Sequence, residues 1–105
     1  MKACIVQPKA TAEIDDHARY IAINHPVAAA EFLDQILNTF RSIRSGATWF
    51  AHVDIGRYPG LRRATVGRFK WYKIYFTADD ERVVVIRVLH DARDITTQLD
   101  QSFSG

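Results

Sequence analysis

The stretch Arg82-Val-Val-Val-Ile-Arg-Val-Leu-His-Asp-Ala-Arg-Asp94 decides the fold. Its first half is apolar and β-branched, which is typical of a strand at the centre of a small sheet. One charge, Arg87, interrupts this run, and His90, Arg93 and Asp94 follow where a buried strand must emerge into solvent. The stretch therefore predicts a central strand that ends in a cluster of ionisable side chains.

Two more strand-like runs precede this one, at residues 61–66 and 69–78. The connections between the three runs are short enough for hairpin turns, so the runs predict an antiparallel meander. Alternation of side chains places Val84, Ile86 and Val88 on the face that the rest of the domain covers. The uncovered face then mixes charged and apolar side chains, namely Trp71, Lys73, Tyr75, Val83, Val85, Arg87 and Leu89.

The N-terminal half predicts a strand and two helices. Residues 2–7 form a short strand that stops at Pro8, and helical spacing runs from Lys9 to Asn24. Pro26 begins a second helix after a tight turn. Its apolar stripe consists of Ala29, Phe32, Leu33, Ile36, Leu37, Phe40 and Ile43.

These elements give one domain over residues 1–105, which is long enough for a single core. The predicted fold class is α+β, an N-terminal strand and an antiparallel helix hairpin packed on a small antiparallel sheet (βααβββ). Residues 94–99 predict a short C-terminal turn or helix. Residues 44–60 form a long loop, and its aromatic side chains Trp49, Phe50 and Tyr58 are expected to fold back over the core rather than to anchor a partner.

Composition narrows the classes of function. Cys4 is the only cysteine, and the four histidines lack metal-ligand spacing, so neither a disulfide nor a metal or other cofactor is expected. No apolar run approaches the length of a membrane helix or a secretory signal, which predicts a cytoplasmic protein without a membrane partner.

Positive charge is concentrated in the middle of the chain. Residues 55–78 contain six basic residues and no acid, although the net charge of the whole chain is only +2. This asymmetry favours either an anionic partner or a solvated face balanced by acidic helices. No nucleophile motif is present, and the remaining catalytic option is phosphodiester chemistry. It would use His90 with Arg87, Arg93, Lys73 and one of Arg62 or Arg63, unless these residues merely bind.

His90 and Arg87 also have purely structural interpretations. A histidine that closes a strand is often hydrogen-bonded to backbone or to a carboxylate, here Asp94. Arg87 would pair with Asp91 or Asp94 to fix the exit of the strand. Arg93 and Asp94 are expected to form a local pair.

Several motifs in this order resemble the RelE/ParE toxin superfamily, most closely its ParE branch. The resemblance covers residues 3–99. It rests on the first helix from Pro8, Tyr20-Ile-Ala, Pro26-x(2)-Ala-Ala, Pro59-Gly-Leu-Arg62, Tyr72-Lys-Ile-Tyr-Phe76 and Ile86-Arg-Val-Leu-His-Asp-Ala-Arg-Asp94.

The resemblance implies a toxin of a type II toxin-antitoxin pair, neutralised by a cognate antitoxin in a hetero-oligomer. RelE-like relatives cut mRNA on the ribosome, and ParE-like relatives poison DNA gyrase. The ribonucleases use a basic cluster with a tyrosine or histidine near the C-terminus, but no tyrosine follows Tyr75. We therefore expect gyrase binding without enzymatic activity. The alternatives are an mRNA endonuclease that uses Arg62, Arg63, Arg87 and His90, or an inactive relic.

The expected binding surface for target or antitoxin is the uncovered face of the sheet. An antitoxin would cover it, together with the groove of the helix hairpin, by an amphipathic helix followed by an extended strand. The residues expected to make these contacts are Arg62, Lys73, Trp71, Tyr75, Val85, Arg87, Leu89 and Arg93.

Overall fold

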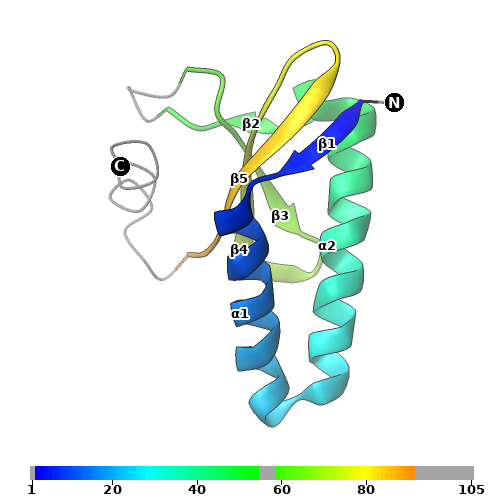
Figure 1. Cartoon of the computed structure of the whole chain (residues 1–105), viewed down its shortest axis with the longest axis vertical. Helices are drawn as coiled ribbons and strands as arrows, with labels where there is room; N and C mark the ends of the chain where they lie inside the picture. Colours follow the sequence, from blue (N-terminus) through cyan, green and yellow to red (C-terminus); the bar gives the residue numbers. More distant parts are fainter. Residues whose placement is uncertain (1, 55–58, 92–105) are drawn as a thin grey trace.

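The structure is a computed structural model that describes residues 2–54 and 59–91. Strand β1 (Ala3–Val6) leads into helices α1 (Pro8–Asn24) and α2 (Pro26–Gly46), and a short 3₁₀ turn, η1 (Ala47–Trp49), follows. Four strands complete the described chain: β2 (Ala51–His52), β3 (Arg62–Val66), β4 (Phe69–Ala78) and β5 (Arg82–His90). The two helices run antiparallel and cover one face of the sheet (Figure 1). The predicted α+β class is confirmed.

A proline opens each helix, where its missing N–H is not needed for helical hydrogen bonding. His25, the single residue between the helices, is held outside the α region by the proline that follows it. Its N–H still bonds to the carbonyl of Ile21, which closes α1. This tight turn makes the hairpin, so the chain reverses without a loop. No helix within residues 2–54 and 59–91 is long and apolar enough to cross a membrane.

The sheet is mixed rather than antiparallel. Its strand order is β1-β5-β4-β3-β2, and β3, β4 and β5 form the predicted antiparallel meander. Strand β1 lies parallel to β5, with Ala3 opposite Arg82 and Val6 opposite Val85. No hairpin turn ties β1 to a neighbour, so turn chemistry does not determine its direction. The short β2, within the predicted loop, adds to the other side of β3.

A β-bulge in β5 changes the faces that alternation predicts. Tyr75 pairs with Arg87 but the next residue, Phe76, pairs with Val85, so Ile86 is an extra residue on β5. A single extra residue reverses the inside-outside pattern on one side of it. The prediction that Val84 and Ile86 face the helices is therefore wrong.

The helix-facing core contains Val83, Val85 and Val88 from β5. The prediction for Val88 is thus correct, whereas Val83 and Val85 lie in the core and not on the uncovered face. From β4, Ile74 and Phe76 point to the helices and Tyr72 packs beside them, as predicted. The helices and η1 supply Ala10, Phe32, Ile36, Ile43 and Ala47, and β3 supplies Ala64 and Val66.

The opposite face of the sheet carries a second, smaller apolar cluster. It consists of the buried Leu61, Tyr75, Ile86 and Leu89, with Val53 and Val84 packed against them. On α2, Leu33 is 40% exposed and Leu37 is 61% exposed, so these two members of the predicted apolar stripe lie on its solvent side.

Candidate functional site

Arg87 lies in the interior and forms an ion pair with Glu13 of α1. The residue is 3% exposed. Its Nε donates to both carboxylate oxygens of Glu13 at 3.0 Å, and its Nη2 donates to Glu13 Oε2 at 2.6 Å. Arg87 was expected on the uncovered face or paired with Asp91 or Asp94. It is buried rather than exposed, the ion pair shown for Asp91 is with Lys73, and Asp94 lies outside the described residues. Arg87 directly follows the extra residue Ile86 and lies opposite Tyr75 in the register of β4 and β5.

Glu13 and His17, one helical turn apart on α1, also hold the backbone of β5. The amide of Val88 donates to Glu13 Oε1 at 3.1 Å, and His17 Nε2 lies 2.9 Å from the Val88 carbonyl oxygen. Strand β1 ends at Val6, opposite Val85, so it does not reach Val88. Side chains of α1 therefore take the place of a neighbouring strand at this position.

His90 belongs to an aromatic cluster at the end of β5. Its ring meets Tyr72 edge-on, with centroids 4.9 Å apart, and His17 meets Tyr72 at the same separation. Phe32 of α2 completes the group. Burial raises the pKa of the Tyr72 phenol, and nearby Tyr20 raises it further. Asp94, the expected partner of His90, lies outside the described residues. Across residues 2–54 and 59–91 no group of three or more histidine, cysteine or acidic side chains is placed to hold a metal ion.

The basic residues of β3 and β4 do not all lie on one face of the sheet, because neighbours along a strand point to opposite faces. Arg62 is half-buried and donates to the carbonyl of Phe50 at 2.7 Å, while Arg63 is exposed. Lys73 pairs with Asp91 at 3.2 Å and contacts the carbonyl of Lys70. Two of these three cations are thus engaged with the protein's own oxygens.

Trp71 and Tyr75 share the face of β4 that points away from the helices, but they differ in exposure. Trp71 is 57% exposed, and the ammonium of Lys70 sits 5.4 Å from the centre of its ring. Tyr75 is fully buried, and its hydroxyl finds no hydrogen-bond partner in the described part of the chain. Burial raises the pKa of Tyr75; attraction from Arg63 offsets part of the rise, although the two groups do not adopt ordinary hydrogen-bond geometry.

The structure also places two further residues of the expected contact surface, Val85 and Leu89. Val85 and Leu89 are fully buried, on opposite faces of the sheet. Both were expected to be exposed on the contact surface, and neither is. Arg93 lies outside the described residues. Of the expected contact residues that the structure describes, Trp71 presents the largest exposed apolar side chain.

Trp49 is the most exposed large apolar side chain of the described chain. It is 85% exposed, so the expectation that it folds back over the core is wrong. A side chain at Gly46 would collide with its ring, which shows that the indole lies against the end of α2. Phe50 does pack against the core, as expected, and Tyr58 lies outside the described residues.

Sequence reasoning missed Glu13 and His17 as partners of β5. Their spacing of four residues places both on one flank of α1, beside its apolar face. That spacing was the available signal, but no local pattern in the sequence predicts the bulge in β5 beside Arg87 and Val88.

Comparisons with known proteins agree with the geometry. A family described as the ParE toxin of the type II toxin-antitoxin system, parDE, matches residues 4–95. No individual curated protein matches the chain significantly. Among solved structures, a chain of the chromosomal ParDE toxin-antitoxin system from P. aeruginosa superposes with a TM-score of 0.69 at 18% identity, covering 86% of this chain and 96% of that chain. At this identity the superposition shows the fold alone. The family match spans most of the chain, and we conclude that this protein belongs to the ParE toxin family of type II toxin-antitoxin systems.

Proposed function

We propose that this toxin arrests growth by binding DNA gyrase, without catalysing a reaction of its own, and that a cognate antitoxin neutralises it. The observation that carries the proposal is the family match over residues 4–95. Target and neutralisation are inferences from the family, since a shared fold does not establish a function.

The state of the basic residues supports binding rather than RNA cleavage. General acid-base chemistry on a phosphodiester needs cations aimed at the developing charge. Arg87 is directed at Glu13 instead, and Lys73 is paired with Asp91. Repositioning Arg87 would leave the Glu13 carboxylate without this partner, which is costly in a buried pair.

Exposed aromatic side chains support a protein target. Trp71 is 57% exposed and Trp49 is 85% exposed, and tryptophan is among the residues that dominate protein–protein binding energies. The ammonium of Lys70 sits 5.4 Å from the centre of the Trp71 ring, so a target would meet an aromatic anchor beside positive charge.

A gyrase supercoiling reaction tests the proposed target. Purified toxin in stoichiometric excess should inhibit supercoiling, and Trp71→Ala should raise the concentration for half-inhibition by about 30-fold, since anchor residues contribute about 2 kcal/mol or more. Tyr20→Ala is the matched control, because Tyr20 is also an exposed aromatic residue but lies on α1, across the sheet from Trp71. Uninhibited supercoiling at excess toxin would exclude gyrase as the target.

The second candidate function is ribosome-dependent mRNA cleavage. Its specific support is the contact of His90 with Tyr72, which also touches His17, because three side chains able to exchange protons meet there. Adding the toxin to ribosomes that translate a defined mRNA would reveal cleavage. Loss of that cleavage in a folded His90→Ala variant would identify His90 as the acid-base group, and intact mRNA with the unaltered toxin would exclude this function.

A further inference from the structure

Helix α2 carries two lengthwise stripes of side chains, one buried and one exposed. The buried stripe repeats at alternating intervals of three and four residues and consists of Ala29, Phe32, Ile36, Thr39, Ile43 and Gly46. The exposed stripe has the same spacing and consists of Val27, Ala30, Asp34, Leu37 and Arg41. This spacing keeps side chains on one line along a helix, as in the seam of a coiled coil. The two stripes begin two residues apart, which places them on opposite sides of α2.

The exposed stripe lies on the side of α2 that points away from the sheet. The two helices form one layer over the sheet, and the buried stripe is the side of α2 that packs into the core (Figure 1). Val27 is 74% exposed and Leu37 is 61% exposed, so the outer stripe presents apolar side chains to water. A helix that packs on one side alone carries polar side chains on the other. The stripe therefore has the composition of a second contact surface.

The charges of the exposed stripe flank its central apolar residue. Asp34 lies three residues before Leu37, and Arg41 lies four residues after it. Asp34 and Arg41 are about two turns apart, which is too far for them to pair within one helix. Neither forms an ion pair with any residue in the described ranges, 2–54 and 59–91. An acid and a base on either side of one leucine can instead meet the opposite charges on a second copy of the same helix.

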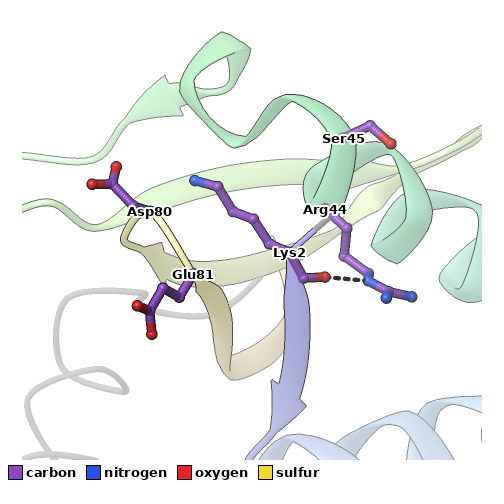
Figure 2. A pocket seen from close by; sticks show the side chains of 5 residues that line it. All are labelled: Lys2, Arg44, Ser45, Asp80 and Glu81. Carbon is purple, nitrogen blue, oxygen red and sulfur yellow. Dashed lines mark hydrogen bonds between the residues drawn. The ribbon is translucent and has the colours of Figure 1, made fainter.

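The exposed stripe ends before the next position of the repeat, Arg44. Figure 2 shows the Arg44 side chain turned toward β1, where its Nε donates to the carbonyl of Lys2 at 2.7 Å. Arg44 is thus engaged within its own chain, and with Lys2 it lines a polar hollow beside the end of α2. Arg41, three residues earlier, is the basic residue that the stripe offers to a partner.

Charge determines how two copies of the stripe can pair. In a parallel pair each Asp34 would lie beside the other Asp34 and each Arg41 beside the other Arg41, and like charges repel. In an antiparallel pair centred on Leu37, Asp34 of each copy lies beside Arg41 of the other, offset by about 1.5 Å along the helix axis. This arrangement is two-fold symmetric, so it makes two ion pairs and brings the two Leu37 side chains together on the axis. The stripe thus favours antiparallel pairing.

We infer that the exposed stripe of α2 is the interface of a toxin homodimer, in which two copies of α2 pack antiparallel about Leu37. The inference goes beyond the proposed function and depends neither on gyrase nor on an antitoxin. The stripe has few large apolar side chains, so the interface is smaller than that of an obligate dimer. We expect a dissociation constant in the micromolar range.

Sedimentation equilibrium of the purified toxin, residues 1–105, tests the dimer. The average molecular mass should rise from 12.0 kDa toward twice that value as the protein concentration increases. Leu37→Glu places two like charges on the two-fold axis and should raise the dissociation constant at least about tenfold. Because the Leu37 side chain is exposed, this variant should keep the circular dichroism spectrum of the unaltered toxin. A toxin that keeps the mass of one chain at every concentration overturns the inference.

Exchanging the charges gives a more specific test. Asp34→Arg gives both contacts two positive charges, and Arg41→Asp gives both contacts two negative charges, so each variant alone should dimerise at least about tenfold more weakly. An equimolar mixture of the two variants should form a heterodimer about as tightly as the unaltered toxin dimerises, because opposite charges then meet at both contacts. Asp16→Arg is the matched control, since it makes the same change of charge at an exposed position of α1 and should leave dimerisation unchanged.

Each other outcome contradicts the inference in its own way. An unaltered toxin that dimerises, with both charge variants dimerising equally well, pairs through another surface. A mixture of the two variants that stays monomeric shows that Asp34 does not face Arg41 of the other copy. If the unaltered toxin is monomeric and Asp34→Arg weakens its complex with the product of the neighbouring reading frame, the stripe binds the antitoxin instead. Gyrase inhibition is measured separately in the supercoiling reaction, so the proposed function can fail or hold independently of the dimer.

Discussion

Replacing Glu13 by glutamine should destabilise the toxin more than any other change of a single charge on α1. The substitution keeps the shape of the side chain but removes the negative charge that faces Arg87, which is 3% exposed. It also turns one oxygen, which accepts from Arg87 or Val88, into a donor. Losing one partner of a buried ion pair costs about 3 to 5 kcal/mol.

The lower end of this range applies, since the Glu13 side chain is 16% exposed and water reaches part of it. A loss of about 3 kcal/mol lowers the midpoint of thermal unfolding by roughly 12 to 24 °C in a domain of this size. Urea unfolding followed by circular dichroism measures the free energy directly. Asp16→Asn is the matched control on the same helix, exposed and expected to change stability by less than about 0.5 kcal/mol.

A double-mutant cycle separates the pair from its surroundings. Arg87→Met removes the buried charge and keeps an apolar side chain of similar length. The double variant should be more stable than the sum of the two single changes predicts, by at least about 1.5 kcal/mol, because neither charge is then left without the other. If Glu13→Gln costs less than about 1 kcal/mol, or the two changes are additive, the ion pair is not what holds α1 to β5.

Three further changes test other parts of the structure. Tyr75→Phe should stabilise the protein by about 1 kcal/mol in urea unfolding, because it removes a buried hydroxyl that has no hydrogen-bond partner among residues 2–54 and 59–91; a destabilisation would reveal a hydrogen bond. Burial raises the pKa of Tyr75 in the folded protein. The folding stability linked to the neutral phenol is therefore complete below the unfolded pKa of about 10 and is lost as the pH rises through the folded pKa. Because Tyr75→Phe removes the ionisable group, it should move alkaline unfolding to higher pH. Burial likewise raises the pKa of Cys4, so iodoacetamide at pH 8 should alkylate the folded protein more slowly than the urea-unfolded chain, and equal rates would contradict this. Gly67→Ala should cost roughly 1 kcal/mol of unfolding free energy, because Gly67 has a φ of +47°, and an unchanged stability would show that the turn relaxes.

The order of the helices and strands could be predicted from local sequence patterns. Pro8 and Pro26 mark the starts of the helices, and the spacing around Phe32 and Ile36 identifies the buried face of α2. Short connections fix the meander of β3, β4 and β5. These signals act over a few residues, so reasoning from the sequence could use them.

The faces of β5 could not be predicted because the bulge depends on long-range contacts. Alternation holds only as long as each residue has one opposite neighbour, and Ile86 has none of its own. The bulge is compatible with Glu13, which accepts from both Arg87 and Val88, and Glu13 lies 74 residues from Arg87 in the sequence. No residue near Arg87 in the sequence indicates that Glu13 is its partner.

The predicted positions of the candidate contact residues were partly right and partly wrong for the same reason. Tyr75 was correctly placed on the face away from the helices, since β4 alternates without interruption from Tyr72 to Phe76. Val85 was misplaced because it lies before the extra residue, where the inside-outside pattern is reversed, whereas Val88 and Leu89 after it keep the predicted faces. Trp49 was expected to be buried, and its exposure follows from its place on η1, after α2 has ended.

Growth after induction tests the central claim, that this chain is a toxin neutralised by its antitoxin. The gene is placed under an inducible promoter, and the neighbouring reading frame under a second, independent promoter. Induction of the toxin alone should halt the increase in cell density, and inducing both should restore it. Normal growth with the toxin alone, at a level of folded protein confirmed by immunoblot of the soluble fraction, would contradict the account, and so would an arrest that no level of the neighbouring product relieves.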